Sequence, residues 1–151
     1  MQIRNFSFGA TAAIVTSIGL IVGFDAATAS KATILSGLLI VAIADNLTDS
    51  LSIHIYQESE RLEPRAAFRA TLTNFAARLG LSLSFVFLMV ILPLHVAVVA
   101  SILWGLMLLT GLSYVVAQTR KLPVMREIAK HLAVAVVVMA SSKMIGHLIS
   151  E

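Results

Sequence analysis

Residues 32–54 of the chain read "ATILSGLLIVAIADNLTDSLSIH", and this stretch is the most informative about the fold. Its first half is a mostly apolar run of the kind that crosses a bilayer as part of a helix of about 20 residues. Its second half carries two aspartates, Asp45 and Asp49, among small polar residues. The first half indicates a membrane helix, and the second half raises the question of why such a helix holds two acids.

The composition of the whole chain also indicates a membrane protein. Of 151 residues, 58% are hydrophobic and only 13% are charged, and the mean hydropathy is +0.93. A soluble domain has about 25% charged residues, so this chain lacks the polar surface that such an apolar fraction would need. There is no cysteine, which excludes disulfides, thiolate metal sites and thiol catalysis. The net charge of +3 resides in short connectors and does not indicate nucleic-acid binding.

Five helical segments are predicted, each near the roughly 20 residues needed to cross a bilayer. They cover residues 8–24, 32–56, 66–92, 95–117 and 127–149. Pro64 is expected to start the third segment, and Pro93 lies in a tight turn before the fourth. The first segment is longer than the apolar core of a signal peptide, so we expect it to remain as a span. The predicted fold is an all-α membrane protein, with residues 1–151 as a single transmembrane domain.

Basic residues predict the orientation of these helices. Because basic connectors stay on the cytoplasmic side, we expect a cytoplasmic N-terminus, an outside C-terminus and a place in the plasma membrane of a prokaryote. Lys31 and Lys143 fall on the outer side, and Arg78 lies inside the third segment. The basic residues assigned to the inner side are Arg4, Arg61, Arg65, Arg69, Arg120, Lys121, Arg126 and Lys130.

Small residues recur at four-residue spacing in three segments, which lets helix backbones approach closely in lipid. We interpret most of these stripes as packing within one subunit, and at least one is a candidate face for a homodimer. The stripes are Gly19–Gly23, Ala76–Gly80–Ser84 and Ala97–Ser101–Gly105.

The two aspartates are four residues apart, so they share one helix face with Cβ atoms about 5–6 Å apart. An ionised aspartate near the bilayer centre costs about 2.5–3.5 kcal/mol on insertion scales, and two adjacent carboxylates repel each other. The hairpin after the second segment brings Arg78 back to a similar depth, so we expect an ion pair with Asp45 or Asp49. Two interpretations remain open: this pair locks two helices together, or the carboxylates bind a divalent cation in transit.

Polar residues surround the aspartates on several faces of the same helix. Lipid does not tolerate this on all sides, so these residues line a wet vestibule or project into the cytoplasm. His54, Glu58 and Glu60 are candidates for the point where a cation first binds. The predicted transport pathway comprises Asn46, Ser52, His54, Glu58 and Arg78.

Three stretches resemble the vacuolar iron transporter family. "FGATAAIVTSIGLIVG" is similar to that family's opening helix, "IADNLTDSLSIHIYQESE" to its second helix, and "SSKMIGHLIS" to its last. The resemblance runs in order through most of the chain. It implies a homodimer that exports ferrous iron or manganese from the cytoplasm against protons, with Asp45 as a retained metal-binding acid.

The chain also departs from that family's pattern. Thr11 and Ala12 stand where the family has an Asn-Asp pair, and Asp49 stands where it has a methionine. The connector after the second segment is too short for the glutamate-rich cytoplasmic hairpin of many members. One acid is thus lost from the first helix and one is gained in the second, which would relocate the metal site or abolish it. Arg78 at a similar depth favours its loss, because a cation near the metal weakens binding.

The expected function is therefore transport of divalent metal cations, iron or manganese, with proton-coupled export and Asp45 and Asp49 as metal ligands. The expected partners are the bilayer, divalent cations, protons and a second copy of the chain, and no resident cofactor is expected. The alternative is a non-transporting scaffold or subunit in which both aspartates pair with Arg78. An intramembrane aspartyl protease does not fit, because its acids would come from separate helices in a Gly-x-Gly-Asp setting, so we do not expect an enzyme.

Overall fold

The computed structural model describes residues 2–60 and 63–151, and their regular structure is helical throughout. Five of the helical stretches are long and apolar enough to cross a membrane, which confirms the predicted number of spans and agrees with a multi-pass membrane protein. The elements are α1 (Gln2–Ala26), α2 (Lys31–Ile40), the π-helical segment η1 (Val41–Asp45), α3 (Asn46–Ser59), α4 (Pro64–Ile91), α5 (Leu94–Arg120) and α6 (Val124–Ser150).

Several boundaries follow from residues that the sequence singled out. Pro64 stands at the start of α4, where its missing N–H leaves no hydrogen bond unmade. Pro93 directly precedes α5, so the turn between α4 and α5 is as tight as predicted. Ser30 caps α2 by accepting a hydrogen bond from the backbone N–H of Thr33. The second span differs from the prediction, because it is not a uniform α-helix but is interrupted by η1.

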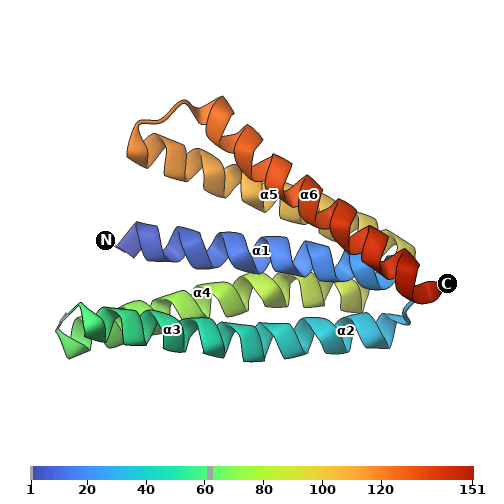
Figure 1. Ribbon diagram of the computed structural model, residues 1–151, viewed down its shortest axis with the longest axis horizontal. Coiled ribbons are helices and arrows are strands. Elements are labelled where there is room, and N and C mark those ends of the chain that lie inside the picture. Colours follow the sequence, from blue (N-terminus) through green and yellow to red (C-terminus); the bar gives the residue numbers. More distant parts are fainter. Residues whose placement is uncertain (1, 61–62) are drawn as a thin grey trace.

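The helices run alternately up and down, so their connections gather at two ends (Figure 1). The start of α1 and the α3–α4 and α5–α6 connections lie at one end, which we call the hairpin end. The C-terminus and the α1–α2 and α4–α5 connections lie at the opposite end. Most of the connector basic residues belong to the hairpin end, although Arg61 lies outside the described residues.

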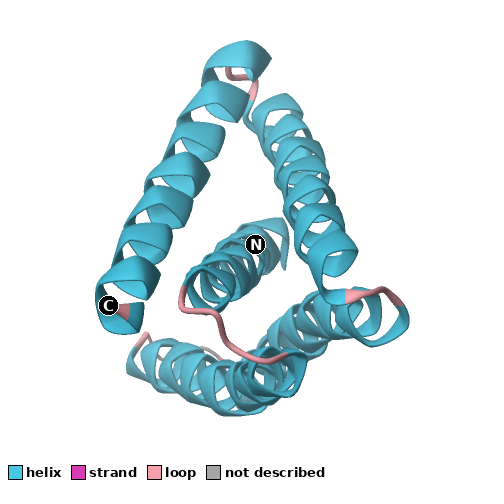
Figure 2. Ribbon diagram, turned by 90° about the vertical axis from the view of Figure 1, so that its right-hand side faces the viewer, coloured by secondary structure: helices cyan, strands magenta, loops and turns pink. Residues whose placement is uncertain are grey.

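Helix α1 occupies the centre of the bundle, and the other helices lie around it (Figure 2). It contacts α2, α4, α5 and α6. Its buried side chains, such as Ile14, Ile18 and Ile21, pack against Phe85 and Leu109 of α4 and α5 in one apolar core. The outer faces of the surrounding helices are apolar as well, as expected where lipid replaces water; examples are Leu47, Leu51 and Ile55 of α3, Leu103 and Met107 of α5, and Val137 and Met144 of α6.

The small-residue stripes are used mainly within the subunit. A Cβ on Gly146 of α6 would lie 2.3 Å from the carbonyl oxygen of Gly23, so α1 and α6 meet almost backbone to backbone. Gly105 packs in the same way against Ile18 and Phe85. Gly80 is different, because no atom lies within 4 Å of the position its Cβ would take, so the α4 stripe is open at Gly80.

A groove of about 500 Å³ lies between α1 and α6 beside their close contact. Its lining is almost wholly apolar, with Thr16 and Ser142 as its polar side chains, and no charged residue takes part. This groove is therefore not a candidate for binding a cation.

Candidate functional site

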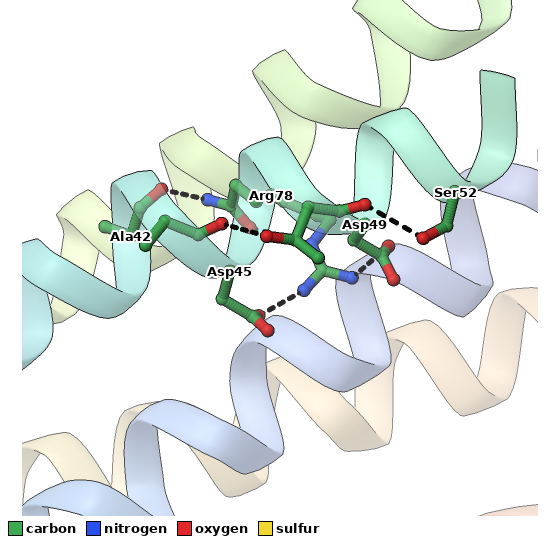
Figure 3. Close-up of polar contacts among 8 residues, drawn as sticks. Ala42, Asp45, Asp49, Ser52 and Arg78 are labelled. Carbon is green, nitrogen blue, oxygen red and sulfur yellow. Dashed lines mark hydrogen bonds and ion pairs between the residues drawn. The ribbon is translucent and has the colours of Figure 1, made fainter. Parts of the chain in front are cut away.

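Three charged side chains meet at Arg78 in the middle of the bundle. This residue lies at the midpoint of the 28-residue α4, and its side chain is only 2% exposed. Its guanidinium donates three hydrogen bonds, all to side chains of the second span (Figure 3). Nη2 donates to Oδ2 of Asp45 over 2.6 Å, Nη1 to Oδ2 of Asp49 over 2.5 Å, and Nε to Oδ1 of Asn46 over 2.7 Å. We call these four residues the Arg78 cluster.

The predicted ion pair between Arg78 and the second span is confirmed, and both Asp45 and Asp49 take part in it. Asp45 is the midpoint of the 29-residue span Lys31–Ser59, and Arg78 is the midpoint of α4. Helices that rise 1.5 Å per residue and start from a common hairpin bring such positions to the same level. The cluster therefore lies near the middle of the bundle, far from either end.

Asn46 is the neutral member of the cluster, and both polar atoms of its amide have a partner. Its Nδ2 donates to the carbonyl oxygen of Ala42 over 2.5 Å, while its Oδ1 accepts from Arg78. Because a guanidinium only donates, the oxygen of the amide has to face it. The bond to Ala42 thus fixes the amide in the orientation that Arg78 requires.

The segment η1 explains how these acceptors come to face α4. A π-helical turn contains one residue more than an α-helical turn, so the helix that follows is rotated by about 100° relative to an uninterrupted one. Asp45 ends η1 and Asn46 begins α3. This rotation turns Asn46 inward, where it is 1% exposed, with Asp45 and Asp49 on either side of it.

The electrostatics of the cluster are unbalanced. Two carboxylates face one guanidinium, so the cluster carries a net charge of −1 when both acids are ionised. Arg78 is enclosed, whereas the side chains of Asp45 and Asp49 are 48% and 27% exposed. The negative charge is thus on the more exposed side of the cluster.

The remaining pathway residues of the sequence analysis lie away from Arg78. Ser52 is exposed, and its hydroxyl donates to the carbonyl of Thr48 in its own helix (Figure 3). His54 and Glu58 form a separate pair nearer the hairpin end, with Nε2 and Oε1 3.4 Å apart. Glu60 caps α3 at its exposed end. Among the described residues, no group of three or more His, Cys, Asp or Glu side chains is arranged to hold a metal.

Two structural neighbours of Arg78 were not among the predicted site residues. A Cβ on Gly9 of α1 would lie 2.2 Å from Oδ1 of Asn74 and 2.9 Å from Cδ of Arg78, so α1 approaches the cluster at a glycine. Asn74 lies one turn from Arg78 and is 1% exposed. A glycine inside an apolar helical run is a signal of close backbone approach, and Gly9 carried that signal.

Comparison of the chain with protein-family models, with curated proteins and with solved structures found no match.

Proposed function

We propose that this protein transports divalent cations across a membrane, with Asp45 and Asp49 as the cation-binding carboxylates. In this proposal Arg78 is a resident cation that occupies the site between transport events. Ferrous iron or manganese is the proposed substrate, because carboxylate and amide oxygens suit hard and borderline divalent ions. The resemblance to the vacuolar iron transporter family implies the same substrate class.

The convergence of three side-chain oxygens on one positive charge carries this proposal. Oxygens of Asp45, Asp49 and Asn46 lie 2.5–2.7 Å from guanidinium nitrogens. If Arg78 withdraws, the same oxygens surround the position that it leaves. Two ionised carboxylates then balance the charge of a divalent ion, whereas Arg78 alone leaves them one charge short.

Proton coupling follows from the chemistry of these ligands. A carboxylate has to be ionised to bind a metal, so protons compete with the metal for the same oxygens. Protons arriving from the side opposite to the metal would release it. The return of Arg78 to the aspartates would then reset the site.

The rule that basic connectors stay inside gives the orientation in this proposal. The hairpin end, with the start of α1 and the α3–α4 and α5–α6 connections, would face the cytoplasm of a prokaryotic cell. A second copy would complete the homodimer that the family resemblance implies, with the open α4 stripe around Gly80 as its candidate face.

A non-transporting scaffold is the second candidate, and a specific observation favours it. Arg78 is almost wholly enclosed and each of its three donor nitrogens has a partner. Removing one partner from such a buried ion pair typically costs about 3–5 kcal/mol, so the cluster would serve as a lock between α3 and α4. This alternative leaves one negative charge of the cluster uncompensated when both acids are ionised.

Flux into proteoliposomes distinguishes the two candidates. Uptake of Mn²⁺ and Fe²⁺ is measured with and without a pH gradient for the wild type, for Asp45→Asn/Asp49→Asn and for Asp25→Asn. Asp25 is an acid at the end of α1 outside the cluster, so its variant is the matched control. The proposal expects flux that falls by at least about tenfold in the double variant, equivalent to about 1.4 kcal/mol, and stays near wild type in the control. A folded wild type without flux of either ion would favour the scaffold.

A further inference from the structure

Buried polar atoms without partners are concentrated on one side of the Arg78 cluster. Among the described residues, six side-chain atoms are buried and lack a hydrogen-bond partner, and five of them lie on α3 and α4. They are Oγ of Ser50, Nδ1 of His54, Oε1 of Gln57, and both amide atoms of Asn74; the sixth is Oγ of Ser101 on α5.

These atoms follow one line from the cluster to the hairpin end. Ser50 lies four residues after Asn46 on α3, and Asn74 lies four residues before Arg78 on α4, so each is about 6 Å closer to the hairpin end. His54 and Gln57 continue the line along α3, and His54 also pairs with the exposed Glu58. Ser50, Asn74 and Gln57 are 6%, 1% and 3% exposed. We call this line the polar seam.

The interior beyond the cluster, toward the opposite end, has a different character. Its large buried side chains are apolar and come from three helices. They include Ile18 and Ile21 of α1, Ile34 and Leu38 of α2, and Phe85 and Met89 of α4. Buried polar side chains on this side are isolated serines, Ser17, Ser82 and Ser101, among the large apolar ones.

A dry polar seam is energetically unfavourable. Each buried donor or acceptor without a partner costs roughly 1–3 kcal/mol, and water is the usual partner when protein groups provide none. The seam lies at helix contacts, since Ser50 and Gln57 are on α3 and Asn74 of α4 also faces Gly9 of α1, and a small separation of these helices would admit water. Water there would satisfy all five atoms and would reach the carboxylates of the cluster.

We propose that the polar seam takes up water and is the route by which cations and protons reach Asp45 and Asp49 from the hairpin end. This inference rests on the proposed function, which identifies the ions that would pass along the seam. Access is one-sided in this state, because large apolar side chains fill the interior on the other side of Arg78, where Ser82 and Ser101 are isolated buried polar side chains. Asn74 and Ser50 are the side chains that a hydrated ion would meet last before the cluster.

Cysteine accessibility tests this proposal directly, because the native chain has no cysteine. Single variants Ser50→Cys, Asn74→Cys and Gln57→Cys are reconstituted in liposomes and treated with a charged, membrane-impermeant thiol reagent from either side. Leu51→Cys on the apolar outer face of α3 and Ala42→Cys, buried on the other side of the cluster, are the controls. Glu60→Cys, at the exposed end of α3, reports which side is the hairpin side.

We expect the seam cysteines to react from the hairpin side at least about tenfold faster than either control, because a thiol reacts as the thiolate and needs water to ionise. Seam cysteines that react as slowly as Leu51→Cys would overturn the proposal. If one variant loses its monodisperse profile, the other two decide the result. If the seam cysteines react but the protein shows no flux, transport is refuted and the hydrated seam is supported. If the protein shows flux but the seam cysteines do not react, transport is supported and the hydrated seam is refuted.

Discussion

Nε of Arg78 lies 2.7 Å from Oδ1 of Asn46, and this bond joins the middle of α4 to the first residue of α3. The neutral amide holds the guanidinium between two carboxylates that compete for it. Its own orientation is fixed by the carbonyl of Ala42, which the π-helical segment presents. The geometry of the charged cluster therefore depends on a residue that carries no charge.

Replacing Asn46 by Ala tests this dependence. The variant leaves the Nε–H of Arg78 without its partner and removes a side-chain hydrogen bond to the carbonyl of Ala42, so we expect a loss of roughly 1–3 kcal/mol in the free energy of unfolding. Reversible unfolding in mixed micelles measures it. Thr48→Ala is the control, because that exposed hydroxyl bonds only the carbonyl of Ala44, and we expect it to stay within about 0.5 kcal/mol of wild type. Equal stabilities for the two variants would show that Asn46 does not organise the cluster.

A double-mutant cycle between Asp49 and Arg78 tests whether the ion pair is coupled. Arg78→Gln leaves two carboxylates facing each other, and we expect it to cost about 3–5 kcal/mol. Adding Asp49→Asn removes one of those charges, so the double variant should be more stable than the sum of the single effects predicts, by about 0.5–3 kcal/mol. Unfolding of all four proteins under one condition gives the coupling energy. Additive effects would mean that the short contact contributes nothing to stability.

Gly9→Ala tests the close approach of α1 to the cluster. The added methyl group would lie 2.2 Å from Oδ1 of Asn74 and 2.9 Å from Cδ of Arg78, so α1 or both side chains have to move. We expect a loss of about 1–3 kcal/mol, typical of overpacking a buried contact.

Gly80→Ala is the matched control for Gly9→Ala, because no atom lies within 4 Å of the added methyl in the subunit. Alanine is favoured over glycine in a helix by up to about 1 kcal/mol, so this variant should be neutral or slightly stabilising. The same unfolding assay compares the two. A destabilising Gly80→Ala together with a neutral Gly9→Ala would contradict the arrangement of α1 and α4.

Gly146→Ala tests the contact between α1 and α6. Its methyl group would lie 2.3 Å from the carbonyl oxygen of Gly23 and 2.8 Å from Cβ of Ala26. Backbone atoms cannot move aside as a flexible side chain can, so we expect α6 to separate from α1 and stability to fall by about 1–3 kcal/mol. Gly111→Ala on α5, which has no atom within 4 Å, is the control. An unchanged Gly146→Ala protein would show that the two helices do not meet at these glycines.

The spans and the Asp–Arg pairing were predictable from the sequence for physical reasons. An apolar run of about 20 residues has the length needed to cross a bilayer as a helix. A buried charge needs a partner, and the depth of Arg78 left Asp45 and Asp49 as the nearest candidates. The constant rise of a helix made that depth readable from residue numbers alone.

The details of the cluster were not predictable in the same way. The sequence "VAIAD" of η1 gives no local signal for a π-helical turn, because each residue is compatible with an ordinary helix. Without the rotation that η1 introduces, Asn46 has no reason to point at Arg78. The position of the polar seam likewise depends on which face of α3 turns inward, and the π-helical segment η1 changes that face.

Binding of Mn²⁺ to the wild type and to Arg78→Gln tests the central claim most directly, since the claim is that Arg78 and a divalent ion compete for Asp45 and Asp49. The electron paramagnetic resonance signal of free Mn²⁺ gives the dissociation constant in nanodiscs, with Asp45→Asn/Asp49→Asn as the control for sites elsewhere. We predict weak Mn²⁺ binding to the wild type and binding at least about tenfold tighter to Arg78→Gln, equivalent to about 1.4 kcal/mol. We predict no specific binding to the aspartate double variant. A folded Arg78→Gln protein that binds Mn²⁺ no better than the double variant would contradict the claim.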